Sequence, residues 1–184
     1  MAKKPGKAFE DRVKSSAEDL GCDFQRFIDA GYSVDQDKER EDSDKRFTPS
    51  NICDCLVFYN GILTYIECKS YESSIPFSQT EKQRKRLKKK WKPESLVSCG
   101  FLCEFRNAGE VWFIPLCEFD RMKTFLVKQS FSAKDVVHYG IRVGEITPQG
   151  KRSPRLNVPK MIVDIFEKHV RGPYEKSQAA NKEK

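Results

Sequence analysis

The sequence predicts a mixed α/β fold, in which helices and strands share one domain. Two β-rich runs, 52–59 and 62–69, lie on either side of Asn60-Gly61. This dipeptide is the strongest short signal of a β-hairpin, because a type I′ turn needs positive φ at both central positions. Apolar residues recur at helical spacing over 7–20, and further helical and β-rich segments follow the hairpin. The length of 184 residues fits one domain of about 100–200 residues and excludes a large multidomain enzyme.

The N-terminal part is predicted to hold one helix over 7–20 and one strand over 22–28. Residues 1–6 are expected to be a loose N-terminus. Six of the ten residues in 35–44 are acidic, and the surrounding segment 29–50 lacks the pattern of a packed element. We therefore expect 29–50 to be an exposed acidic loop.

After the hairpin, a helix is predicted to begin at Ser78 and to end near Trp91 and Pro93. Glu81 lies three residues after Ser78, so the two residues match a capping box. Two strands are predicted next, over 96–105 and 110–116. Three helices are predicted after them, over 117–127, 132–140 and 157–169, and the residues 171–184 are expected to be a disordered tail.

The charge of the chain is concentrated in one place. There are 34 basic and 27 acidic residues, for a net charge of +7. Eight of the basic residues lie within 82–92, which contains no acidic residue, so the rest of the chain is close to neutral. This basic stripe favours a polyanion as partner, either nucleic acid or an anionic membrane. Its helix offers only Leu87 and Trp91 as apolar anchors, which makes the membrane the weaker alternative.

The sequence has the features of a cytoplasmic protein. No apolar stretch approaches the roughly 18 residues of a membrane span, and the N-terminus is not followed by the apolar core of a secretory signal. The seven cysteines are expected to be reduced residues of the core. A zinc site is the alternative, but the cysteine pairs 53/55 and 99/103 lack the usual ligand spacing, and His138 and His169 lie far from them in sequence.

A two-residue turn also determines which residues of the hairpin face each other. In this register Asp54 lies directly opposite Glu67, with the two Cβ atoms about 5 Å apart on one face of the sheet. Lys69 is two residues beyond Glu67 and shares that face. The hairpin is therefore predicted to gather two acids and one lysine at its open end, away from the turn. A solvated ion pair at a strand edge is the alternative interpretation.

Two acids and a lysine suit a divalent metal. Mg²⁺ prefers oxygen ligands and keeps several waters, so one or two carboxylates and a substrate phosphate make a typical site. Such a metal polarises a phosphodiester and activates a water, and Lys69 would position that water or stabilise the transition-state charge. On the following helix Gln83, Leu87 and Trp91 form one row. The two apolar residues are expected to face the core, and Gln83 to point toward the acids.

The basic stripe is expected to contact phosphates, which carry no sequence information, so recognition would depend on the shape of the nucleic acid. The residues assigned to these contacts are Lys82, Arg84, Lys85, Arg86, Lys88, Lys89, Lys90 and Lys92.

Asp54 followed thirteen residues later by Glu67-Cys68-Lys69 resembles the motif of the PD-(D/E)xK nuclease superfamily. Within that superfamily the chain is similar to the RecU-type Holliday junction resolvases. Further likenesses lie at Glu10 and in the segments 75–83, 110–114, 132–140 and 155–166, so the resemblance covers residues 6–166.

The resemblance implies a restriction-endonuclease-like core, with a mixed central sheet flanked by helices, as one nuclease domain over 7–170. It also implies a Mg²⁺-dependent endonuclease, with Mn²⁺ as a substitute, that acts in DNA recombination and repair. The implied substrate is branched DNA in the form of a four-way junction, and the implied enzyme is a homodimer. Neither a membrane nor a small-molecule cofactor is expected as a partner.

The resemblance further assigns roles to individual residues. Asp54, Glu67 and the backbone carbonyl of Cys68 would hold the metal. Glu10 would ligate the metal or bind one of its waters. Gln83 would orient the nucleophile or the catalytic Lys69.

One segment departs from the family. The resolvases carry a long stalk before the catalytic aspartate, whereas 29–50 is shorter and strongly acidic here. Two alternatives therefore stay open: a repair or restriction-like endonuclease of the same superfamily, and a nucleic-acid-binding or virion protein with a decayed nuclease fold. The complete set of Asp54, Glu67 and Lys69 counts against decay.

Overall fold

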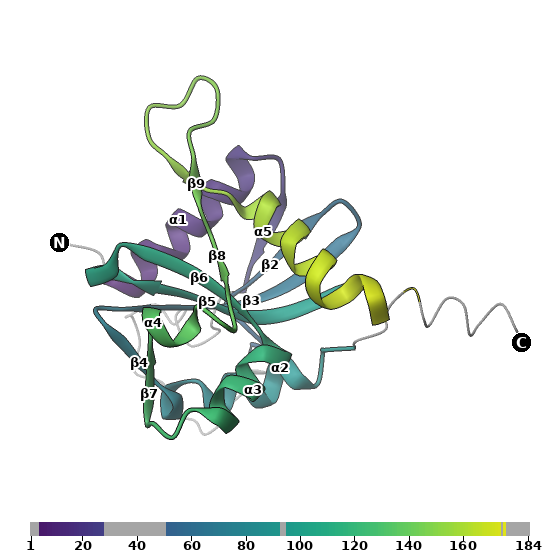
Figure 1. The fold of residues 1–184 in the computed structure, drawn as a ribbon. Coiled ribbons are helices and arrows are strands. Elements are labelled where there is room, and N and C mark those ends of the chain that lie inside the picture. Colours follow the sequence, from purple (N-terminus) through teal and green to yellow (C-terminus); the bar gives the residue numbers. More distant parts are fainter. Residues whose placement is uncertain (1–3, 28–50, 93–94, 174, 176–184) are drawn as a thin grey trace, which may run out of the picture.

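A central sheet covered on both faces by helices forms the body of the protein (Figure 1). The computed structural model describes residues 4–27, 51–92, 95–173 and 175. The predicted acidic loop 29–50 and residues 176–184 of the predicted tail lie outside the described residues, whereas residues 171–173 of that tail are helical. The predicted mixed α/β class, with helices flanking a mixed central sheet, is confirmed.

The sheet has six strands in the order β1, β2, β3, β5, β6 and β8. Their bounds are β1 Asp23–Arg26, β2 Cys55–Tyr59, β3 Ile62–Tyr71, β5 Val97–Phe105, β6 Glu110–Pro115 and β8 Ile141–Arg142. β3 and β5 are parallel over 63–71 and 97–105, and the other neighbours are antiparallel. A parallel pair needs a crossover connection, so the chain between β3 and β5 passes over one face of the sheet.

The β2–β3 hairpin has the predicted register from the turn to Cys55, which pairs with Ile66. The predicted pairing of Asp54 with Glu67 is not formed, because the amide of Asp54 donates to the carbonyl of Ile66 at 3.2 Å, one residue out of that register. Asn60 and Gly61 have φ angles of 48° and 80°, both positive, as a type I′ turn requires. The turn signal therefore predicted the pairing of 55–59 with 62–66, but not the exact position of Asp54 beside β3.

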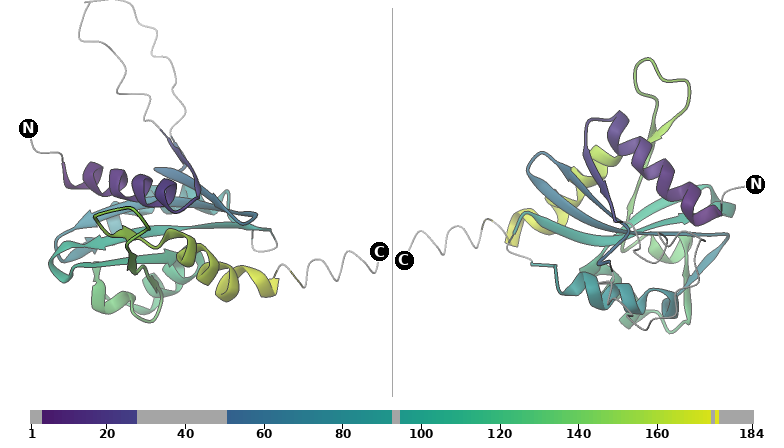
Figure 2. Two further views of the ribbon diagram at one scale, coloured as in Figure 1. Left: turned by 90° about the horizontal axis from the view of Figure 1, so that it is seen from above. Right: turned by 180° about the vertical axis from the view of Figure 1, so that it is seen from behind.

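The helices form two layers. α1 (Pro5–Asp19) and α5 (Val158–Ile165) pack on one face of the sheet, and α2 (Glu81–Lys88), α3 (Leu116–Phe125) and α4 (Ala133–Val136) pack on the other. The view from behind shows α1 and α5 on the same side of the strands and α2 on the opposite side (Figure 2). The crossover between β3 and β5 thus carries α2, and with it the basic stripe, onto the second face.

Each face of the sheet has its own apolar core. On the α1 side, Phe9 and Val13 belong to the same cluster as Ile162 of α5. On the other side the rings of Phe101 and Phe119 lie 4.5 Å apart between centroids. All seven cysteines are unpaired, and five of them are buried as expected, whereas Cys68 and Cys117 are partly exposed.

Several short elements were not predicted. They are β4 (Ser74–Pro76) paired with β7 (Ser130–Ser132), β9 (Glu145–Ile146) paired with β10 (Arg155–Leu156), and the 3-10 turns η2 (Phe77–Gln79) and η3 (Arg106–Ala108). The predicted helix 157–169 is formed by α5 and the π-helical turn η4 (Phe166–Val170).

The predicted bounds of the basic helix are wrong. Ser78 lies in the 3-10 turn η2, so it cannot cap the helix, and α2 begins at Glu81. The residue before it, Thr80, directs its hydroxyl back to a carbonyl of η2 at 2.7 Å. The chain turns through η2 because β4 is held against β7 just before it. α2 ends at Lys88, so Trp91 follows the helix and does not belong to it.

Two later helices begin as predicted. The amide and hydroxyl of Ser132 donate to Asp135 at 2.9 and 2.8 Å before α4. The side chain of Asn157 accepts from the amide of Lys160 at 3.2 Å at the start of α5. α5 then continues into η4, which includes His169. No helix in the described part of the chain is long and apolar enough to cross a membrane.

Candidate functional site

The open end of the β2–β3 hairpin gathers the predicted acids and lysine. Asp54 precedes β2, and Glu67 and Lys69 lie on β3. Lys69 Nζ donates to Glu67 Oε1 at 2.9 Å, and the backbone amide of Cys68 donates to Asp54 Oδ2 at 2.7 Å. We call Asp54, Glu67 and Lys69 the acidic centre.

Glu67 is the most buried member of the acidic centre, with 5% of its side chain exposed. Burial, together with the nearby charge of Asp54, raises the pKa of Glu67 to about 7, although Lys69 and Arg86 act in the opposite direction. A carboxylate is costly to bury unless a cation compensates it. Lys69 supplies only part of that compensation, so the position favours a further cation.

Lys69 is held as a cation. Its side chain is 14% exposed, and burial alone would lower the pKa of this lysine. The charge and hydrogen bond of Glu67, with the charge of Asp54, outweigh burial and raise the pKa of Lys69 above its usual value. The ammonium group therefore stays protonated beside the acids.

Glu10 approaches the acidic centre from α1, on the other face of the sheet. Burial raises the pKa of Glu10, and the charge of Asp54 raises it further, whereas Arg26 lowers it. The Arg26 Nε atom lies 3.7 Å from Glu10 Oε2. Glu10 is thus an electrostatic neighbour of Asp54 that is also paired with an arginine.

The acidic centre fits the requirements of Mg²⁺ in its donor chemistry. Asp54 and Glu67 present carboxylate oxygens, the ligands that Mg²⁺ prefers, and Mg²⁺ needs only one or two of them from a protein. Among the described residues, these two acids and Glu10 do not form a group of three whose ligand atoms all lie within 4.8 Å of one another. The predicted use of the Cys68 carbonyl as a ligand stays a prediction.

The structure adds Arg86 to the acidic centre. Arg86 is half-buried on α2, and its Nη1 donates to the carbonyl of Asn51 at 2.9 Å, three residues before Asp54. Its charge acts on Glu67, where it lowers the pKa. The sequence prediction placed Arg86 among the phosphate contacts. Arg86 follows Gln83 by three residues, and residues three apart are neighbours on a helix surface. Since Gln83 was expected to point toward the acids, this spacing could have indicated that Arg86 points the same way.

The basic stripe is not uniform. Arg84 Nη1 lies 3.4 Å and Lys88 Nζ 3.7 Å from the carboxylate of Asp120 on α3, and Arg84 Nε lies 3.6 Å from Glu81. These two basic residues are paired within the protein, which weakens their assignment as phosphate contacts. The stripe residues that are exposed and not in any of these ion pairs are Lys82, Lys85, Lys89, Lys90 and Lys92.

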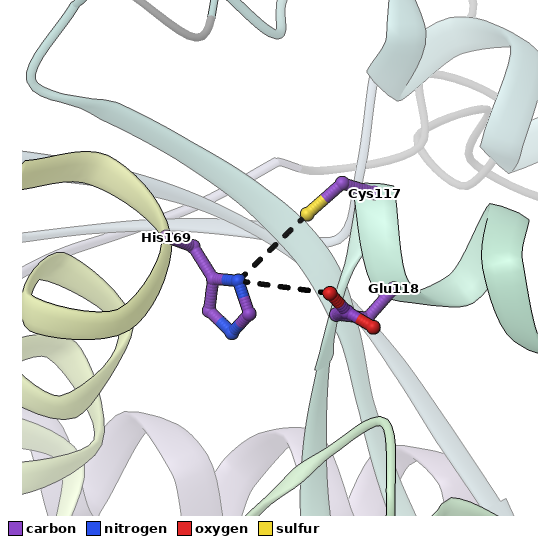
Figure 3. Close-up of side chains that lie close together, drawn as sticks. All are labelled: Cys117, Glu118 and His169. Carbon is purple, nitrogen blue, oxygen red and sulfur yellow. Dashed lines mark hydrogen bonds and ion pairs between the residues drawn. The ribbon is translucent and has the colours of Figure 1, made fainter. Parts of the chain in front are cut away.

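A second group of ligand-type side chains lies elsewhere, where α3 meets η4 (Figure 3). Cys117 Sγ and Glu118 Oε1 each lie 4.0 Å from His169 Nδ1. Burial raises the pKa of the Cys117 thiol and lowers the pKa of His169. We call Cys117, Glu118 and His169 the cysteine–histidine group. Sequence separation argued against a cysteine–histidine site, but the fold brings these two residues together.

Comparison with known proteins finds a similar solved structure but no matching family. No protein-family model and no curated protein matches the chain. Among solved structures, the chain is similar to the Holliday junction resolvase Hjc of the archaeon Archaeoglobus fulgidus. The identity is 15%, the TM-score is 0.49, and the match covers 74% of this chain and 95% of that one. A likeness at this level carries no conclusion about activity.

Proposed function

We propose that the protein is a metal-dependent DNA endonuclease that hydrolyses phosphodiester bonds at the acidic centre. The observation that carries the proposal is the buried Glu67, held 2.9 Å from the ammonium of Lys69 and close enough to Asp54 for its charge to raise the pKa of Glu67. A solvated ion pair does not account for it, because Glu67 is 5% exposed and its pKa is raised to about 7.

The residues of the centre would divide the work. Asp54 and Glu67 would hold Mg²⁺, or Mn²⁺ in its place, with Glu10 and the Cys68 carbonyl as further oxygen donors. The bound metal would activate a water and stabilise the leaving oxygen. Lys69 would hold the attacking water or the charge that develops on the phosphate. Gln83 would orient the water or Lys69, and Arg86 would add positive charge from the helix side.

The exposed lysines of the basic stripe would bind the DNA backbone next to this centre. α2 packs on the same face of the sheet as Glu67 and Lys69, since Arg86 of α2 acts on Glu67. Phosphate contacts position DNA without reading its sequence. The proposed enzyme would therefore select its substrate by shape.

As substrate we propose the four-way DNA junction, cut by a homodimer of the RecU type, as the sequence resemblance implies. Two symmetric cuts in one junction need two active sites, which a dimer supplies. The alternatives are a PD-(D/E)xK endonuclease of repair or restriction, and a protein that binds DNA without cutting it.

The test compares a four-way junction, a duplex and a flap of equal length as substrates, with Mg²⁺ and then Mn²⁺. We expect metal-dependent cleavage of the junction in preference to the other two. Preferred cleavage of the duplex or the flap would instead support a PD-(D/E)xK endonuclease of repair or restriction. Binding of junctions with no cleavage in either metal would overturn the proposed activity.

Asp54→Asn and Glu72→Gln make a matched pair of variants for this assay. Asp54→Asn should abolish cleavage and leave junction binding in place. Glu72 is an acid close to the end of β3 whose side chain is 75% exposed, so Glu72→Gln should cleave like the parent. Equal activity of Asp54→Asn and the parent would show that the centre is misassigned.

A further inference from the structure

We propose that Cys117, Glu118 and His169 form a zinc site that joins α3 to the C-terminal helix. This site is separate from the acidic centre and does not depend on the proposed nuclease function. Cys117 and Glu118 lie in the first turn of α3, and His169 lies in η4, so the ligands come from parts of the chain far apart in sequence.

The geometry is close to that of a bound metal. The sulfur and carboxylate ligands each lie 4.0 Å from His169 Nδ1, and all three ligand atoms lie within 4.8 Å of one another. In a tetrahedral zinc site, ligand atoms at bond lengths of about 2.0–2.3 Å are roughly 3.5 Å apart. A contraction of about half an ångström, within reach of side-chain rotation, would bring the two distances to His169 to that spacing.

The ligand types select zinc over magnesium. Thiolate and imidazole are soft or intermediate donors that suit Zn²⁺, whereas Mg²⁺ takes oxygen ligands almost exclusively. A thiolate and a carboxylate also balance the two charges of the ion. Three protein ligands leave a fourth position for water. Glu118 and His169 retain 13% and 20% exposure of their side chains, so a solvent molecule can reach the group.

Arg121 is a competitor for one of the ligands. Its Nη1 donates to both oxygens of Glu118 at 2.9 Å. The Arg121 side chain is 63% exposed, so it can move into solvent or keep one oxygen while the metal takes the other. Arg121 therefore lowers the affinity for zinc without blocking the site.

The place of the group in the fold defines its role. α3 belongs to the helical layer on one face of the sheet, and η4 continues α5 of the opposite layer. A metal at this point would connect the two layers beyond the sheet. Its effect would be to hold the C-terminal helix against the body of the protein.

The protein has one other histidine, which provides the matched control. His138 is exposed and lies outside the group. The full-length protein, stripped of metal, is titrated with zinc against a chromophoric chelator. We expect one zinc per chain in the parent and in His138→Gln. His169→Gln should bind more weakly by about 100-fold or more, since loss of even an outer-sphere partner weakens metal sites by about 10–100-fold.

Cobalt provides a spectroscopic test of the sulfur ligand. Co²⁺ bound through Cys117 should give a thiolate charge-transfer band, which Cys117→Ser should lose and Cys22→Ser should keep. Absence of zinc binding in the parent would overturn the proposal. Equal zinc affinity of the two histidine variants, or a persistent band in Cys117→Ser, would also overturn it. Circular dichroism of each variant separates ligand loss from unfolding.

Discussion

The acidic centre and the cysteine–histidine group are two ligand clusters built in different ways. The acidic centre comes from one hairpin, in which Glu67 and Lys69 lie on one strand and Asp54 lies just before the other. The cysteine–histidine group joins the start of α3 to η4, and only the packing of the whole chain brings it together. One cluster offers oxygen atoms and an ammonium group, and the other offers sulfur, nitrogen and oxygen.

Because their ligand atoms differ, the two clusters should bind different metals. Oxygen ligands suit Mg²⁺, whereas a thiolate and an imidazole suit Zn²⁺. The two functions should therefore be separable by mutation, by metal and by pH. Each of the following experiments tests whether the two clusters act independently.

The largest expected effect comes from Lys69→Met. This change removes the ammonium group 2.9 Å from Glu67, and we expect the single-turnover rate of junction cleavage to fall by about 10²–10³-fold. Zinc affinity should be unchanged. The matched variant is His169→Gln, in which cleavage with Mg²⁺ should be normal and zinc binding weak. Loss of both properties in either variant would mean that the two clusters are coupled.

The second effect is a pH dependence of stability that belongs to Glu67. Its pKa is raised from 4.5 to about 7 in the folded, metal-free protein. Between these two values the folded state binds a proton that the unfolded state lacks, so the contribution of Glu67 to stability falls as the pH rises. From about pH 5 to pH 8 the parent should lose roughly 2–3 kcal/mol relative to Glu67→Gln.

Urea denaturation of both proteins, measured with chelator at several pH values, tests this expectation. The comparison between parent and variant cancels the contributions of titrating groups that do not interact with Glu67. A pH-independent difference between them would show that Glu67 is ionised throughout. Glu118→Gln should not reproduce the effect of Glu67→Gln.

A smaller effect should separate the exposed lysines of the basic stripe from the paired ones. Lys89→Ala and Lys90→Ala should each reduce the slope of log affinity against log salt by about 0.9, because each removes one phosphate contact. Lys88→Ala should do less, since Lys88 lies 3.7 Å from Asp120.

Lys168, an exposed residue of η4 beside the cysteine–histidine group, is the control for this series. Lys168→Ala should leave the salt slope of junction binding unchanged. Fluorescence anisotropy over a range of salt concentrations measures both values. An equal change of the salt slope in Lys168→Ala would mean that the DNA contacts η4 as well as the basic stripe.

The smallest effect concerns Arg121→Gln, which frees the Glu118 carboxylate from its ion pair. Exposed ion pairs contribute little, so zinc should bind roughly two- to threefold more tightly. The chelator titration used for the histidine variants has the resolution for this change. Weaker binding in Arg121→Gln would indicate that the arginine holds Glu118 in place and does not compete with the metal.

Local signals in the sequence predicted the hairpin that carries the acidic centre. Asn60-Gly61 determined the hairpin register, and the register placed Glu67 and Lys69 on one face. The caps at Ser132 and Asn157 were also visible in the sequence, because they depend on residues three positions apart.

Long-range contacts could not be predicted in this way. Ser78 had the spacing of a cap, but the pairing of β4 with β7 placed it in a 3-10 turn. The ion pairs of Asp120 with the basic stripe depend on how α2 packs against α3. The approach of Cys117 to His169 depends on where the C-terminal helix ends.

The parallel pairing of β3 with β5 has a consequence for the order of folding. The hairpin closes a two-residue turn, whereas β5 reaches β3 only after the whole crossover with α2 has been closed, which costs more chain entropy. Glu67 pairs with Phe101 of β5. Before β5 docks, Glu67 is an ordinary solvated acid on a bare hairpin. A nascent chain that ends before β5 would carry every residue of the acidic centre and still lack its buried carboxylate.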